Sequence, residues 1–203
     1  QEQGGTPGSI YGVGIDGSSI QTSTGHITIT GGEDASSNAA NAGGAGVTLY
    51  NSTIQTTGAT GNITITGTTG QNNGTGNARN GVQIDARGDN ARMVVATQGG
   101  DIAITGTSNV TNHADAAGIR MRAPKTDNTN VNNAEVRIVS RTGNITLTGD
   151  SPVNSHLDSA GIRLDGSYWA RIRIGHDGTN NHSGNTTLTT SSLVQQNFAA
   201  GSL

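Results

Sequence analysis

A four-residue phrase in which Ile or Leu alternates with Thr recurs along this chain and constrains its fold more than any other feature. It reads Ile-Thr-Ile-Thr at 27–30 and 63–66, Ile-Ala-Ile-Thr at 102–105 and Ile-Thr-Leu-Thr at 145–148, with a degenerate copy at 186–189. Alternation with period two predicts a half-buried strand whose apolar side chains point inward and whose Thr side chains point outward. The copies lie about 36 to 43 residues apart. The pattern therefore predicts a solenoid built from strands alone, a parallel β-helix.

Two further strand families lie between the Thr-rich strands. One begins with Gly followed by Val or Ile and spans 12–15, 46–49, 81–84, 118–121 and 161–164. The other is less regular and lies around Ile20, around Ile54 and at 93–95, 136–138 and 172–174. Three strands per coil predict a triangular cross-section, with a long loop after the third strand. We therefore expect an all-β fold of about five rungs, spaced about 4.8 Å apart.

A glycine precedes each Thr-rich strand by two residues, where the chain must turn a corner. We expect these glycines to allow a sharp bend with positive φ; they are Gly25, Gly61, Gly100, Gly143 and Gly184. Asn62, Asn144 and Asn185 follow three of them. Asn at a repeated corner is expected to form a ladder of hydrogen bonds between rungs.

The composition fits a solenoid better than an ordinary globular domain. Only 31% of the residues are hydrophobic and 2% aromatic, a composition also found in disordered chains. A β-helix needs few aliphatic residues per rung, and the regular spacing of the Ile pairs argues against disorder. We therefore expect a single β-helical domain over 1–203. With no cysteine, the chain has no disulfide or thiolate metal site. No segment is long enough for a membrane span, and the net charge of −3 gives no case for nucleic-acid binding.

The most regular rungs resemble a known family of repeats. Gly-Asn-Ile-Thr-Ile-Thr-Gly at 61–67, Gly-Asn-Ile-Thr-Leu-Thr-Gly at 143–149 and Ala-Gly-Ile-Arg-Leu at 160–164 resemble the β-helical repeats of filamentous-haemagglutinin-like large exoproteins of bacteria. The resemblance covers about residues 10–190. It implies a right-handed parallel β-helix, secreted or attached to the cell surface, that serves as an adhesin stalk. The amino-terminal secretion domain of that family is not visible in this sequence, and the unit of about forty residues is longer than the family's compact coil.

Neither end of the sequence carries a charged cap or an amphipathic helix, and an uncapped solenoid exposes its ladder edges. We therefore expect a segment of a longer solenoid or a fibre subunit, whose partners are further rungs or neighbouring copies. The expected function is structural or adhesive, extracellular and non-catalytic, without a cofactor, and host or matrix glycans are further candidate partners.

The outward Thr positions form a candidate binding face. Its members are Thr28, Thr30, Thr64, Thr66, Thr105, Thr146 and Thr148, and Ala103 interrupts one column. A flat Thr-x-Thr array resembles the ice-binding face of β-helical antifreeze proteins. The alternative is that Thr simply serves as a good outward strand residue.

Two aligned loops form a candidate metal site. The segment 106–120 aligns without gaps on 149–163, which places His113 near His156 and Asp115 near Asp158, about one rung apart. Two imidazoles and two carboxylates could hold a divalent metal. The alternative, which we favour, is that His–Asp hydrogen bonds tie down loops of one shape.

An outward column at the end of the first strand of each coil holds Asp16, Asp85 and Asp165, with Tyr50 and Arg122 between them. Asp85 and Asp165 would lie two rungs apart, near the carboxyl separation of inverting glycosidases. We expect Arg122 between them to keep both carboxyls ionised, which removes the general acid and argues against an enzyme.

The last two rungs are rich in arginine, with Trp169 nearby. This patch could bind acidic glycans, because the guanidinium fork matches carboxylate and sulfate; its residues are Arg120, Arg122, Arg163, Arg171 and Arg173. The alternative, which we favour, is pairing of these arginines with Glu135, Asp158 and Asp165.

Overall fold

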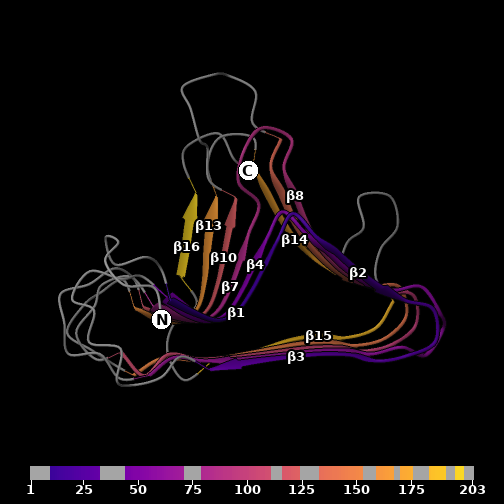
Figure 1. Cartoon of the computed structure of the whole chain (residues 1–203), viewed down its shortest axis with the longest axis horizontal. Coiled ribbons are helices and arrows are strands. Elements are labelled where there is room, and N and C mark those ends of the chain that lie inside the picture. The colour runs from indigo at the N-terminus through magenta and orange to yellow at the C-terminus, as the bar shows by residue number, and fades with distance from the viewer. Residues whose placement is uncertain are drawn as a thin grey trace, which may run out of the picture.

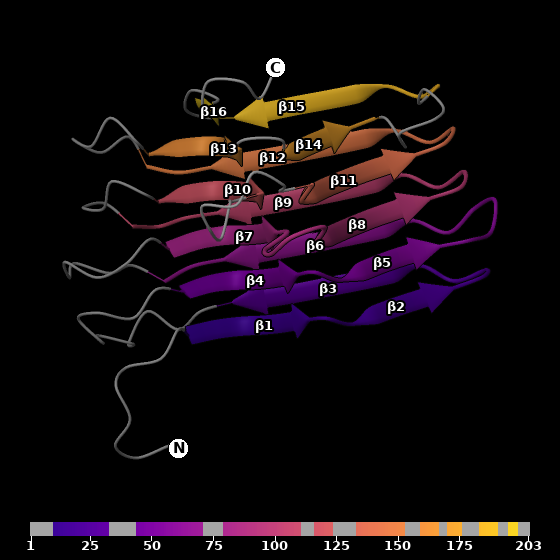
Figure 2. The ribbon, with the colours of Figure 1, turned by 90° about the horizontal axis from the view of Figure 1, so that it is seen from above.

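The computed structural model describes residues 10–32, 44–70, 79–110, 116–123, 133–152, 159–166, 170–175, 183–190 and 195–198. The regular elements in these ranges are β-strands in three parallel sheets. Within the same ranges no helix has the length and apolar character to cross a membrane. Seen along the stacking axis, the sheets form the sides of a triangle (Figure 1), and Figure 2 shows successive coils lying on one another. The predicted parallel β-helix is confirmed.

Each sheet takes one strand from each of five coils, and sheet A has one strand more. Sheet A contains β1 (Ile10–Asp16), β4 (Gly44–Tyr50), β7 (Arg79–Asp85), β10 (Ala117–Ala123), β13 (Ala160–Gly166) and β16 (Gln195–Phe198). Sheet B contains β2 (Ser19–Thr22), β5 (Thr53–Thr56), β8 (Arg92–Thr97), β11 (Glu135–Ser140) and β14 (Arg171–Ile174). Sheet C contains the Thr-rich strands β3 (Ile27–Gly32), β6 (Ile63–Thr68), β9 (Ile102–Thr107), β12 (Ile145–Asp150) and β15 (Thr186–Thr190).

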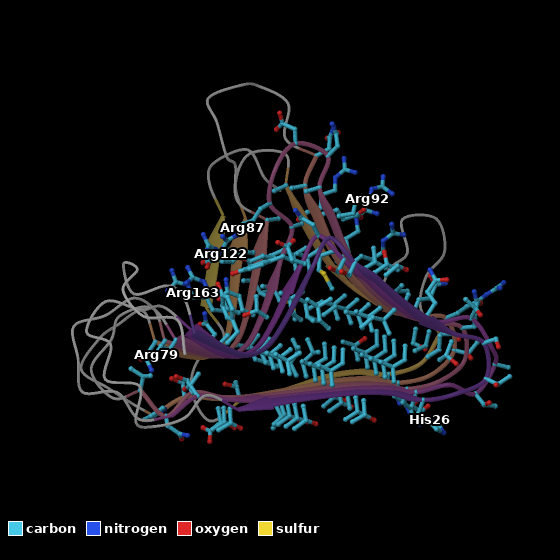
Figure 3. The ribbon with its side chains drawn as sticks, in the orientation of Figure 1. His26, Arg79, Arg87, Arg92, Arg122 and Arg163 are labelled. Carbon is cyan, nitrogen blue, oxygen red and sulfur yellow. The ribbon has the colours of Figure 1, made fainter. Side chains whose placement is uncertain are left out.

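The strand pairing aligns equivalent apolar residues from coil to coil. In sheet C, Ile63 pairs with Ile27 on one side and Ile102 on the other. The inward side chains form one continuous core, drawn as aligned rows in Figure 3. Ile65 in a central coil is fully buried, so the predicted inward register is correct. Full burial of such a side chain stabilises the fold by about 1.5–3 kcal/mol.

Sheets A and C meet at a corner where two columns of glycine face each other. The columns are Gly46, Gly81, Gly118 and Gly161 in sheet A, and Gly31, Gly67, Gly106 and Gly149 in sheet C. A Cβ on Gly106 would overlap the carbonyl oxygen of Gly118, and a Cβ on Gly118 would overlap the backbone nitrogen of Asp150. The two backbones pass in direct contact with no side chain between them, an approach that glycine permits. We call this corner the glycine seam.

The glycines that precede the Thr-rich strands have a different role from the predicted one. Positive φ values in the described ranges belong to Gly17, Gly88, Gly175, Asn51 and Asn90, so the expected positive φ at these corners is wrong. Instead the corner glycines stack closely. A Cβ on Gly61 would lie 2.6 Å from the carbonyl oxygen of Gly25, and Gly100 and Gly143 meet the corner below them in the same way. Glycine is required there by the contact between coils.

A polar ladder runs beside this stack of glycines. The backbone N–H of Asn62 donates to Nδ1 of His26, and that of Asp101 donates to Oδ1 of Asn62. The next two bonds run from the Asn144 N–H to Asp101 and from the Asn185 N–H to Asn144, at 2.7 and 3.1 Å. The predicted ladder exists, but each side chain accepts from the backbone of the next coil, and His26 and Asp101 serve as well as Asn.

Sheet A has a sixth strand that the sequence pattern did not predict. β16 pairs in parallel with β13, with Gln195 aligned on Arg163. The segment lacks the Gly-Val or Gly-Ile start of the other strands in sheet A. Sheet A therefore extends one strand beyond sheets B and C, and the described stack ends unevenly.

The glycine seam can be tested with one added methyl group. We expect Gly106→Ala to lower the free energy of unfolding by about 3 kcal/mol or more, because its Cβ meets rigid backbone rather than a movable side chain. Gly32→Ala is the matched control, since a Cβ there has no heavy atom within 4 Å. Urea unfolding followed by far-ultraviolet circular dichroism measures both. Equal stabilities for the two variants would contradict direct backbone contact at the seam.

Candidate functional site

The outer face of sheet C carries the predicted Thr columns. One column runs Thr28, Thr64, Ala103, Thr146 and Thr187, and the other runs Thr30, Thr66, Thr105, Thr148 and Thr189. These side chains are exposed or half-buried, and they lie in rows along the outer side of the sheet (Figure 3). All seven Thr residues singled out in the sequence share this face. The result is a regular hydroxyl and methyl surface with one gap at Ala103.

The predicted arginine patch is divided between two faces. Arg120, Arg122 and Arg163 lie on the outer face of sheet A, and Figure 3 labels Arg122 and Arg163 there together with Arg87. Arg171 and Arg173 lie on β14 in sheet B. Arg173 pairs with Glu135 at 3.2 Å, and Arg137 pairs with the same carboxylate at 3.5 Å. The five arginines therefore do not form one continuous surface.

On the outer face of sheet A, Gln83, Arg87 and Arg122 surround Asp85, whose side chain is fully buried. Its Oδ2 accepts hydrogen bonds from Gln83 Nε2 and Arg87 Nε, both at 2.9 Å, and Arg122 lies 3.9 Å away. Burial raises the pKa of Asp85, although Arg122, Gln83 and Arg87 act in the opposite direction. Arg122 lowers the pKa of this carboxyl as expected, but the loss of hydration on burial is the larger effect and the net shift is upward.

Tyr50 and Arg87 cover Asp85 from the solvent side. The Arg87 guanidinium lies 4.5 Å from the centre of the Tyr50 ring, and it also donates to the Tyr50 hydroxyl at 3.2 Å. Burial, with help from the charge of Asp85, raises the pKa of Tyr50. Arg87 belongs to the longer corner of the third coil and was not predicted as part of this cluster. The Asn51 side chain holds the Arg87 backbone in place: Oδ1 accepts from the Arg87 N–H at 2.8 Å, and Nδ2 donates to the Arg87 carbonyl at 3.0 Å.

Asp165 forms a second, more complete cluster two coils further on. Arg120 Nε and Arg163 Nε donate to its two oxygens at 2.7 and 2.9 Å. Burial raises the pKa of Asp165, but the two guanidiniums outweigh that effect and hold it below the ordinary value. The register places Arg122 between Asp85 and Asp165 as predicted. The two carboxyls nevertheless have opposite pKa shifts, because the Asp85 side chain is fully buried whereas that of Asp165 is 17% exposed and paired with two guanidiniums.

The remaining predicted site residues lie outside the described ranges. These are His113, Asp115, His156, Asp158 and Trp169. Among the residues that are described, no group of three or more His, Asp or Glu side chains is placed to hold a metal ion.

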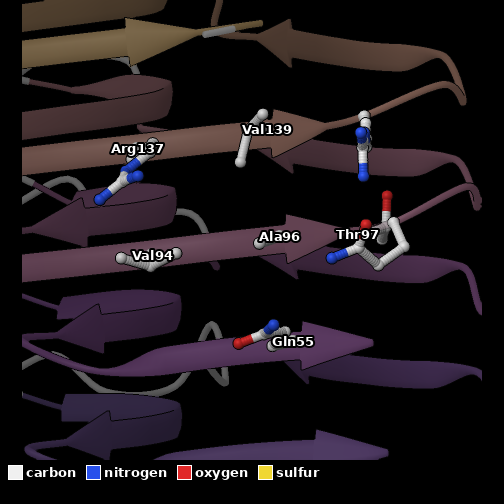
Figure 4. A pocket seen from close by; sticks show the side chains of 8 residues that line it. Gln55, Val94, Ala96, Thr97, Arg137 and Val139 are labelled. Atoms are coloured by element: carbon white, nitrogen blue, oxygen red, sulfur yellow. The ribbon is translucent and has the colours of Figure 1, made fainter. Parts of the chain in front are cut away.

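A groove of about 400 Å³ crosses the outer face of sheet B (Figure 4). Its floor is formed by Val94, Ala96 and Val139, and its rim by Gln55, Gln98, Arg137 and Arg141. It spans β5, β8 and β11, so its residues come from three successive coils. The sequence pattern did not predict this groove. Its only signal is a small residue, Ala96, between Gln55 and Val139 in an outward column.

The two buried carboxyls are expected to change stability in opposite directions with pH. The folded pKa of Asp165 lies below the ordinary 3.8, so its contribution is present above 3.8 and is lost as the pH falls through the folded pKa. The folded pKa of Asp85 lies above 3.8. The unfolded chain then ionises first, and the stability falls as the pH rises from 3.8 towards that folded pKa.

Urea unfolding from pH 2.5 to pH 8 tests this pair of shifts. Relative to Asp165→Asn, we expect the wild type to gain stability as the pH rises towards 4. Relative to Asp85→Asn, the wild type should lose stability as the pH rises above about 4. Stability differences that are independent of pH would contradict the shifts.

In comparisons with known proteins, no protein-family model, no curated protein and no solved structure matches the chain.

Proposed function

We propose that this chain is a rigid structural module of a bacterial extracellular or surface-attached adhesin, a β-helical stalk or fibre segment without catalytic activity. The motifs at 61–67 and 143–149 support this proposal through their resemblance to exoprotein repeats. A stack of parallel coils is stiff along its axis, since every coil is bonded to the next by three sheets. Such a stack suits a spacer that holds another part of a protein away from a surface.

The observation that carries this proposal is the exposure of core columns at the two ends of the described stack. Ile20 in the first coil is 36% exposed, and Leu188 in the last described strand of sheet C is 46% exposed. Their equivalents in the neighbouring coils, Ile54 and Leu147, are fully buried. Each coil is therefore completed by the coils above and below it. In a solenoid the partner for such an edge is another coil.

The isolated chain is accordingly expected to associate through its terminal coils. Sedimentation velocity over a range of concentrations, with electron microscopy of the same samples, should show oligomers or short filaments. Leu188→Lys should weaken this association at least tenfold, because it places a charge on an apolar edge. Thr105→Lys, which puts the same charge on an exposed position of a central coil, should leave it unchanged. A strict monomer at high concentration would count against open edges.

Ice binding through the outer face of sheet C is a second candidate function, favoured by one observation. The two Thr columns are in register over five strands of a parallel sheet. Within a strand the columns are about 6.6–6.8 Å apart, and adjacent strands are about 4.8 Å apart. A regular two-dimensional array of hydroxyl and methyl groups is the feature that ice recognition would use. Ala103 removes one member from the centre of the array.

Thermal hysteresis separates the two functions. A stalk uses its coils as a spacer, so we expect no hysteresis in the wild type and no loss of association in Thr64→Tyr and Thr146→Tyr. Tyr is well tolerated on a strand but disrupts a flat face. Hysteresis in the wild type that disappears in both variants would replace the stalk proposal with ice binding.

A further inference from the structure

We propose that the groove on the outer face of sheet B binds an acidic glycan, a linear oligosaccharide whose sugar units carry carboxylates. The proposal is independent of the structural function above, because a stalk requires no ligand on its sides. It concerns Ala96, Gln98 and Arg141, which no sequence motif had singled out.

The groove exists because one outward column contains a short side chain. Ala96 is paired with Gln55 on one side and with Val139 on the other. Both neighbours are longer, so the surface is depressed at Ala96, and Val94 extends the apolar floor along the same strand. A volume of about 400 Å³ lies within the range of small-molecule sites. The depression thus follows from side-chain size on a regular sheet.

The charge of the groove has one sign. Its two ionisable lining residues, Arg137 and Arg141, are both cationic, and no carboxylate lines it among the described residues. Arg137 is held by Glu135 at 3.5 Å. Arg141 is exposed, and within the described part of the chain no acidic side chain pairs with it. Two guanidiniums in a groove that no described carboxylate lines favour an anionic ligand.

The other groups match a sugar rather than an acidic peptide. The amides of Gln55 and Gln98 offer both donors and acceptors to hydroxyl groups, and the aliphatic floor suits the C–H face of a sugar ring. A peptide would add to a sheet as a strand through backbone hydrogen bonds. The strands beneath this groove are already paired on both sides, so no backbone edge is available. A linear glycan laid across the coils instead meets a new coil about every 4.8 Å.

Isothermal titration calorimetry with the whole chain tests the site. The probe is an oligogalacturonate, and the comparison ligands are a neutral glucan oligosaccharide of equal length and a poly-glutamate peptide of equal charge. Arg141→Gln removes the guanidinium that pairs with no described acidic side chain, and Ala96→Phe fills the depression. Arg92→Gln is the matched control, because Arg92 is exposed on β8 (Figure 3) but does not line the groove. Circular dichroism establishes that each variant is folded.

We expect the oligogalacturonate to bind and the neutral glucan and the peptide to bind at least tenfold more weakly. Arg141→Gln should weaken binding about tenfold, the loss of one charged hydrogen bond. Ala96→Phe should abolish binding, and Arg92→Gln should change the affinity less than twofold. The proposal is overturned by absence of binding, by equal affinity for poly-glutamate, or by equal losses in Arg141→Gln and Arg92→Gln, which would indicate a general charge effect.

Discussion

The close contact of backbones at the glycine seam is the constraint on which the rest of this structure depends. Sheets A and C enclose a narrow angle there, and the triangle closes only if the strands touch without side chains between them. Closure brings the Ile column of sheet C within reach of the Val and Leu columns of sheet A. A core with few aromatic residues is then sufficient, because the space inside is narrow. The low apolar content of the chain and its high glycine content are therefore two aspects of one geometry.

The outer faces of the three sheets show how differently a single scaffold can present polar groups. In sheet C the outward positions are short hydroxyl side chains that leave a flat surface. In sheet A several of them are long charged side chains that pair across coils around the carboxyl groups of Asp85 and Asp165. In sheet B they are mixed in size, and the contrast between Ala96 and its neighbours produces a depression. Each face follows from the residues that stand in register, since the backbone beneath is nearly the same.

The side chains that point into the core could be predicted from the sequence, whereas the arrangement of the outward side chains could be predicted only in part. Alternation with period two placed Ile65 and its equivalents in the core, and the repeat spacing gave the register that aligns Asp85, Arg122 and Asp165. The pattern could not identify the reason for the corner glycines, since close stacking and a positive φ both call for glycine. It missed Arg87, which lies in a corner of irregular length, and β16, which lacks the motif of its sheet. It also missed the groove, because a depression depends on a difference in size between residues about forty positions apart.

The polar ladder that starts at His26 has a consequence for how such a chain changes over time. Each step needs only a side-chain acceptor below and a backbone N–H above, and His, Asn and Asp all supply the acceptor. At this corner the five coils therefore present equivalent connections to their neighbours. A duplicated or deleted coil meets a compatible neighbour on both sides. Gene duplication could then lengthen or shorten the protein by whole coils. Each such change would add or remove one strand, with its outward side chains, in each of the three sheets.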